Sequence, residues 1–121
     1  MGSIKRFEDL EIWKKASEIA VDVFEISGLT RFEKDFGTKD QVRRAALSIA
    51  SNIAEGFEYD NNKDFIRFLK YAKGSAGELR SQLYTLFRAE FIEESFYKEK
   101  HEELLILSKR IATFIKYLKS R

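Results

Sequence analysis

The chain has 121 residues, no cysteine, no proline and a net charge of +2. This length fits one domain spanning residues 1–121, which can bury a core without a metal or disulfide staple. The composition excludes disulfides and thiolate metal sites, and no apolar run approaches the roughly 20 residues of a membrane-spanning helix. Met1–Arg6 lacks the apolar core of a signal peptide, so we expect a cytoplasmic protein.

The first expected helix runs from about Asp9 to Ile26. Asp9 is a candidate N-cap, Phe7 ahead of it can pack onto the first turns, and Gly28 ends the segment. Apolar residues recur at spacings of three and four, which places them on one helix face: Leu10, Trp13, Ala16, Ala20, Val23 and Phe24.

A joint from Leu29 to Gly37 leads to the second expected helix. Thr38 and Gln41 have the spacing of a capping box at its start, and Gly56 is a natural stop. Its apolar face is narrow and made of small residues, which permits a close approach of another helix: Val42, Ala45, Ala46, Ile49, Ile53 and Ala54.

The third expected helix runs from about Lys63 to Arg88, after a turn and cap signal at Asp60–Asn62. Its apolar face is long and continuous, and this continuity favours one helix over two: Phe65, Phe68, Leu69, Ala72, Ala76, Leu79, Leu83, Leu86 and Phe87.

Gly74 and Gly77 lie in the middle of this helix, where each glycine costs about 1 kcal/mol relative to alanine. An alternative interpretation takes Ser75 and Glu78 as a capping box that splits the helix here. We expect the helix to continue, because the apolar phase does not slip across the glycines. The glycines then indicate close packing of another helix, within the protomer or across an interface. They are not a phosphate-binding loop, because the required spacing is absent.

A short joint at Glu90–Glu94 leads to the last expected helix, roughly Ser95 to Lys119, with Glu93 or Ser95 as its cap. Short joints place neighbouring helices antiparallel, so the sequence predicts an all-α, up-down-up-down antiparallel four-helix bundle. The core side of the last helix is marked by Leu104, Leu107, Ile111, Phe114, Ile115 and Leu118.

Four motifs carry a resemblance to a known family: Phe7–Trp13, Arg43–Phe57, Asp64–Leu69 and Gly74–Leu79. On these motifs the chain resembles the bacterial four-helix-bundle family of 23S rRNA intervening-sequence proteins. The resemblance threads through the first three helices, and the last helix matches by length and pattern. Many relatives have a proline after Ile49 where this chain has Ala50, so a bend assigned to that proline is not expected here.

The resemblance implies a protomer that assembles into a ring, typically a homopentamer. Some relatives are encoded inside insertions in ribosomal RNA genes. A related branch consists of accessory proteins of diversity-generating retroelements, which bind a reverse transcriptase and nucleic acid. The family has no accepted enzymatic activity, no catalytic residues and no cofactor to transfer to this chain.

Charge is distributed unevenly between the helices. The third helix has six basic and two acidic residues, a net charge of +4, whereas Asp9–Glu25 has a net charge of −3. A basic stripe repeated around a ring is suited to phosphate contacts, while the alternative is a solvated face whose bases pair with acids of neighbouring protomers. The stripe falls within one arc of the third helix: Lys63, Arg67, Lys70, Lys73, Arg80 and Arg88.

Arg43 and Arg44 open the second helix, where basic residues oppose the helix macrodipole. We therefore expect a compensating group, which is either a carboxylate of a neighbouring helix or subunit, or an anion such as RNA phosphate. Both arginines join the stripe as candidate nucleic-acid contacts.

Other polar and aromatic residues have two readings each. The second helix carries three polar residues, Ser51, Asn52 and Glu55. One interpretation is a polar network or a subunit interface, and the other is that Glu55 is a buried acid or base. Tyr71 and Tyr84 flank the basic arc, where they stack on bases or lie at a subunit interface.

Catalytic motifs are nearly absent. His101 is the only histidine, which excludes two-histidine metal sites, and we expect it on a helix surface. The sequence therefore predicts a non-enzymatic, oligomeric accessory that binds RNA or DNA. The alternative is a ring that only binds protein, for example a reverse transcriptase.

Overall fold

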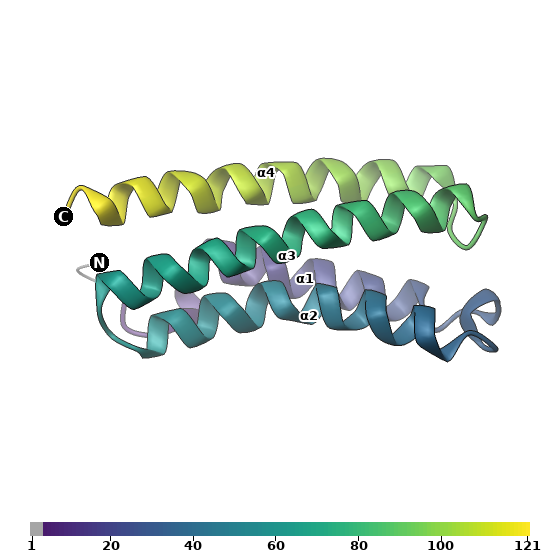
Figure 1. The fold of residues 1–121 in the computed structure, drawn as a ribbon, viewed down its shortest axis with the longest axis horizontal. Coiled ribbons are helices and arrows are strands. Elements are labelled where there is room, and N and C mark those ends of the chain that lie inside the picture. The colour runs from purple at the N-terminus through teal and green to yellow at the C-terminus, as the bar shows by residue number, and fades with distance from the viewer. Residues whose placement is uncertain (1–3) are drawn as a thin grey trace.

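The computed structural model describes residues 4–121 and contains four long helices joined by short turns (Figure 1). Both termini and the α2–α3 turn lie at one end of the molecule, and the α1–α2 and α3–α4 joints lie at the other. The predicted all-α, up-down-up-down four-helix bundle is confirmed, and α3 is continuous through its glycines. The elements in order are η1 Phe7–Asp9, α1 Glu11–Ile26, η2 Thr30–Phe32, α2 Phe36–Glu58, α3 Asn62–Arg88 and α4 Glu94–Lys119.

The start of α1 differs from its prediction. Asp9 lies in η1, and Leu10 occupies the N-cap position without a side-chain cap, so the predicted Asp9 cap is wrong. Phe7 does pack onto the first turns, since its ring centroid is 5.2 Å from that of Trp13. Apolar packing therefore fixes this helix start in place of a capping hydrogen bond.

The second helix begins earlier and ends later than predicted. Asp35 is its N-cap, and the Asp35 Oδ1 atom accepts a hydrogen bond from the Thr38 backbone N–H at 3.1 Å. Thr38 thus lies inside the first turn, and the predicted Thr38–Gln41 capping box is wrong. At the other end, the helix continues past Gly56 to Glu58.

Gly56 serves helix packing and does not terminate α2. The residue is buried, and a Cβ atom placed on it would lie 2.6 Å from the Phe68 Cβ atom of α3. Only glycine permits this approach of the two helices. The turn that follows is made by Asp60, which adopts a positive φ of 60°.

The sequence signals correctly located the N-terminal starts of α3 and α4. Asn61 caps α3 by accepting a hydrogen bond from the Asp64 backbone N–H at 2.8 Å, as the turn signal indicated. Glu93 occupies the N-cap position of α4 but makes no side-chain cap, while Ser95 lies within the helix.

One apolar core runs the length of the bundle and contains residues from all four helices. The α2–α3 contact uses alanines, including Ala46, Ala72 and Ala76, none of which is exposed. Phe32 of η2 closes one end of the core against Phe91, with ring centroids 5.1 Å apart. Among the described residues, no helix is both long and apolar enough to cross a bilayer.

Candidate nucleic-acid interface

The outer face of α3 presents most of the predicted basic stripe. Asn61 fixes the start of α3, and the uninterrupted helix then keeps one register from Lys63 to Arg88, a rise of about 38 Å. The buried residues of α3 face the core, so the opposite side faces solvent. Five of the six predicted side chains are exposed: Lys63, Arg67, Lys70, Lys73 and Arg88.

The exposed basic side chains differ in whether they already make ion pairs or hydrogen bonds within the protomer. Arg67 pairs with Asp64 at 3.0 Å, and its guanidinium lies 4.6 Å from the Phe68 ring centroid. A hydrogen bond from Asn61, followed by one from Arg67, lowers the pKa of Asp64. Arg88 donates to the Tyr84 hydroxyl at 2.9 Å.

The three lysines of the stripe are uncommitted. Lys63, Lys70 and Lys73 make no ion pair with any residue in the described part of the chain. An incoming anion therefore displaces only solvent and counterions from these ammonium groups. Arg80 differs, because it is half-buried and its Nε atom is fully covered, so it does not belong to the exposed stripe.

Arg43 has a structural role within the bundle, and a nucleic-acid contact by this residue stays a prediction. Its Nε donates to the Ser27 hydroxyl at 2.7 Å, its Nη2 donates to the Phe24 carbonyl at 3.0 Å, and its guanidinium lies 4.5 Å from the Phe24 ring centroid. Within the described residues, the group that compensates Arg43 differs from the expected carboxylate. It is the C-terminal end of α1, where unpaired carbonyls carry partial negative charge.

The predicted conflict between the helix macrodipole and the two arginines does not arise. The second helix starts at Phe36, so Arg43 and Arg44 lie beyond its first two turns. Arg44 remains exposed and pairs with Asp40 of its own helix at 2.8 Å. It lies over a polar groove between α2 and α3, whose lining also includes Glu78 and Gln82.

A second basic segment on α4 was missed in the sequence analysis. Residues 109–121 contain five basic residues and no acidic one, and all five side chains are exposed: Lys109, Arg110, Lys116, Lys119 and Arg121. The Asn62 side chain donates to the Leu118 carbonyl at 3.2 Å, which places this segment beside the start of α3. The run without acids was visible in the sequence, but its position next to the stripe follows only from the fold.

Positive and negative residues are consequently distributed unevenly along the long axis of the bundle. The segments at the end with the termini, residues 4–17, 51–73 and 109–121, contain 13 basic and 7 acidic residues. The segments of the other half, residues 18–50 and 74–108, contain 9 basic and 13 acidic residues. We name these halves the basic end and the acidic end.

The two central glycines of α3 face solvent. A Cβ atom on Gly74 or Gly77 would meet no atom within 4 Å, so the predicted close packing within the protomer is wrong. Packing across an interface stays a prediction. Tyr71 and Tyr84 are exposed on the same helix, by 50% and 45%.

The polar residues of α2 divide into two groups. Asn52 donates to the Ser48 carbonyl and hydroxyl, and Ser48 is hydrogen-bonded to Ser75 of α3 at 2.8 Å. This network links the two helices, as expected for Asn52. Glu55 and Ser51 are exposed, so the reading of Glu55 as a buried acid or base is wrong.

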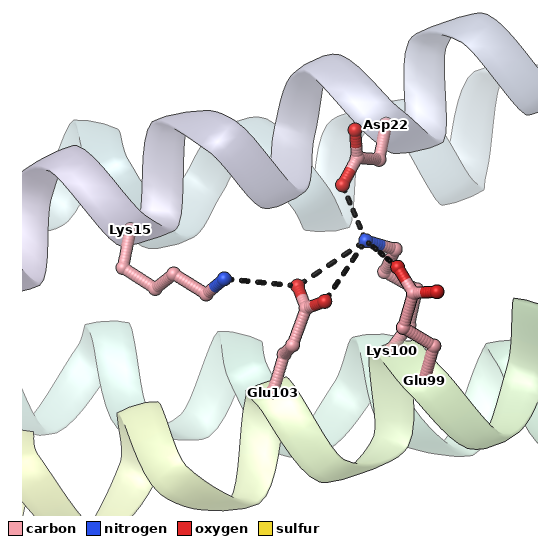
Figure 2. A network of polar contacts seen from close by, with 5 residues as sticks. All are labelled: Lys15, Asp22, Glu99, Lys100 and Glu103. Carbon is pink, nitrogen blue, oxygen red and sulfur yellow. Dashed lines mark hydrogen bonds and ion pairs between the residues drawn. The ribbon is translucent and has the colours of Figure 1, made fainter.

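The most buried charge was not predicted from the sequence. Lys100 of α4 is 2% exposed and bonds to Asp22 of α1 and to Glu99 and Glu103 of its own helix (Figure 2). Burial by itself lowers the pKa of Lys100, but the hydrogen bonds that its ammonium donates to the three carboxylates outweigh burial and raise the pKa. Lys15 adds a second bond to Glu103 at 3.2 Å. The cluster ties α1 to α4 and has the character of a structural ion network.

His101 is half-buried beside Tyr97, with ring centroids 5.5 Å apart. Within residues 4–121, no group of three or more histidine or acidic side chains is placed to hold a metal ion.

Comparisons with known proteins now identify the family. The family described as 23S rRNA-intervening sequence protein matches residues 8–113. A protein of unknown function from the S23 ribosomal protein family of Bacteroides thetaiotaomicron superposes with a TM-score of 0.77 and 27% identity, over 87% of this chain and 98% of its own. No curated protein matches the sequence. The predicted resemblance is thus confirmed, and the chain belongs to the 23S rRNA-intervening sequence protein family.

Proposed function

We propose that this protein is a non-enzymatic, RNA-associated accessory that binds the phosphate backbone with its basic end. One observation carries the proposal: the exposed lysines of α3 adjoin an α4 segment with five bases and no acid. Membership in a family named for an intervening sequence of 23S rRNA supports RNA as the ligand class.

Electrostatics favours phosphate at this surface. Each phosphate that a lysine or arginine neutralises releases condensed counterions, which gives a steep dependence of affinity on salt. Lys63, Lys70 and Lys73 make no ion pair in the described chain, so binding breaks no existing bridge there. Arg67 keeps its bond to Asp64 and is less available.

The shape of the α3 surface supports close contact. Gly74 and Gly77 project no side chain, so a nucleic-acid backbone can approach the helix surface between the basic side chains. Tyr71 is half exposed beside Lys70 and Gly74 and offers a ring for stacking on an unpaired base.

Assembly is part of the same proposal. The homopentameric ring that the family resemblance implies would repeat the basic end in each protomer and multiply a weak phosphate contact. Native mass spectrometry of the purified protein tests this part: a single species at five times the protomer mass is expected, and a monomer would contradict it.

The decisive experiment is binding of labelled structured RNA and duplex DNA, measured by fluorescence anisotropy over a potassium chloride series. We expect the logarithm of affinity to fall linearly with the logarithm of salt concentration. The double variant Lys70→Glu/Lys73→Glu should weaken binding about 10- to 100-fold, because it removes two phosphate contacts and adds repulsion.

A matched control separates local contact from net charge. Lys34→Glu/Lys98→Glu changes the charge by the same amount on exposed lysines of the acidic half and should leave RNA affinity nearly unchanged. An equal loss in both variants, or no binding at low salt, contradicts the proposal. In the second case the alternative of a protein-binding ring gains support. Circular dichroism checks that both variants keep their helix content.

A further inference from the structure

A groove opens at the acidic end, over the last turns of α1 and the first turns of α4. It consists of two adjoining hollows with volumes of about 360 and 510 Å³, which share Ile26 and Leu29. The first lies against α4, and the second continues over the α1–α2 and α3–α4 joints. The two hollows together form one surface depression, which we name the end groove.

The floor of the end groove is apolar and open to solvent. Leu29 lies in the turn between α1 and η2, where its backbone N–H donates to the Ile26 carbonyl, and it is 56% exposed. Exposing a leucine to this extent forgoes part of the roughly 1.5–3 kcal/mol that its burial would provide. The other apolar side chains of the lining come from three helices and the α3–α4 joint: Ile26, Phe87, Phe91, Ile92 and Phe96.

The rim is strongly acidic. The lining contains six carboxylates and two basic side chains, a net charge of −4 in a chain whose overall charge is +2. Both bases are included in this sum: Lys100 is buried in its own network, and Arg31 is exposed, lies over the Phe91 ring and offsets part of the rim charge. The six carboxylates are Asp22, Glu25, Glu90, Glu93, Glu94 and Glu99.

Half of the rim is unneutralised. Glu25, Glu90 and Glu93 make no ion pair with any other described residue. A cation that binds here therefore gains electrostatic energy without displacing a resident base.

We propose that the end groove docks a basic, amphipathic segment of a protein partner. Apolar side chains of the segment would cover Leu29 and the aromatic floor, and its lysines and arginines would pair with the rim. Nucleic acid does not fit this surface, because phosphate would face the uncompensated carboxylates. Charge complementarity thus selects a protein segment rich in basic residues.

The chain's own basic surfaces fit the groove less well. The basic end offers lysines spaced along rigid helices, with tyrosines as its large exposed apolar groups near α3. A second copy of the chain is therefore a competing occupant that the experiment distinguishes. The inference is independent of RNA binding, because it concerns the opposite end of the bundle.

The test uses the full chain and a synthetic probe. The probe is a labelled amphipathic peptide of leucine and lysine, about 14 residues or four helical turns long. A partner peptide with glutamate at every lysine position is the control. We expect the basic peptide to bind in fluorescence anisotropy and to shift amide signals of α1, α4 and the two joints at this end in NMR, while the acidic peptide does neither.

Three variants locate the site. Glu25→Lys/Glu93→Lys should weaken peptide binding about tenfold or more, and Leu29→Ser should weaken it by a smaller factor through lost apolar contact. The matched control Glu55→Lys/Glu58→Lys reverses two exposed carboxylates at the far end of α2 and should have little effect. RNA affinity of the Leu29→Ser variant should stay unchanged, which separates this inference from the proposed function.

Two results overturn the inference. One is equal weakening by the control variant, or amide shifts spread over the basic end, because binding would then follow net charge alone. The other is self-association that Glu25→Lys/Glu93→Lys abolishes and the basic peptide competes away, measured by analytical ultracentrifugation. In that case the occupant of the end groove is a second copy of the chain.

Discussion

The two ends of the bundle share one architecture and differ in the sign of their charge. The basic end contains 13 basic and 7 acidic residues, and the acidic end contains 9 and 13. Adjacent antiparallel helices largely cancel their macrodipoles, so this polarity comes from side chains and from which helix halves the topology brings together. The start of α3 meets the end of α4 at one end, and the end of α1 meets the start of α4 at the other. We therefore propose a different class of ligand for each end.

The largest predicted effect concerns the buried base of the acidic end. Lys100→Met should lower the free energy of unfolding by about 2–3 kcal/mol, because three carboxylates lose their shared partner. The cost stays below that of a fully buried pair, since Glu99 and Asp22 reach solvent and Glu103 keeps Lys15. Urea unfolding followed by circular dichroism measures it.

Lys70→Met at the basic end is the matched control for this change. Lys70 is exposed and makes no ion pair in the described chain, so we expect a change in the free energy of unfolding within about 0.5 kcal/mol.

The stability contributed by Lys100 should also depend on pH. The pKa of Lys100 is raised in the folded protein, so its contribution is complete below the ordinary lysine pKa and is lost as pH rises through the folded-state value. A stability difference between wild type and Lys100→Met that persisted well above this range would contradict the assignment.

The next effect concerns two glycines that both lie inside helices. Gly56→Ala should destabilise the protein by about 1–3 kcal/mol, since its Cβ would lie 2.6 Å from the Phe68 Cβ and the helices must move apart. Gly74→Ala should stabilise it by about 0.5–1 kcal/mol, because alanine is the better helix former and its Cβ meets nothing. Thermal unfolding of both variants tests the pair, and destabilisation by Gly74→Ala would indicate that this face is packed in the assembled protein.

Sequence periodicity was sufficient for the architecture because long amphipathic helices with short joints leave few other arrangements. Helix ends were less predictable. Asp35 and Thr38 both carry capping side chains, and only the path of the joint decides that Asp35 is used. Gly56 likewise has the pattern of a helix stop, while its role in the fold depends on Phe68, which lies on another helix.

The candidate interface was predictable only within single helices. The α3 stripe follows from spacing along one helix, and five of its six bases are exposed as expected. Arg43 could not be assigned in this way, because its partners Ser27 and Phe24 belong to the preceding helix. The contribution of residues 109–121 and the Lys100 network depend on contacts across the bundle, which no single-helix pattern contains.

The smallest predicted effect probes the electric potential at the basic end. Asp64 lies within the stripe, and hydrogen bonds from Asn61 and then Arg67, with the charge of Lys63, lower its pKa. A lowered folded-state pKa means that the carboxylate stabilises the fold above its ordinary pKa, and that this contribution is lost as pH falls through the folded-state value. In an NMR titration, Asp64 should therefore ionise below its ordinary range. Arg67→Gln should move the midpoint upward, whereas Arg44→Gln on α2 should leave it in place. If the midpoint is unchanged in Arg67→Gln, the hydrogen bond from Asn61 is sufficient to set the pKa of Asp64. The positive charge of the basic end would then have no effect on this carboxylate.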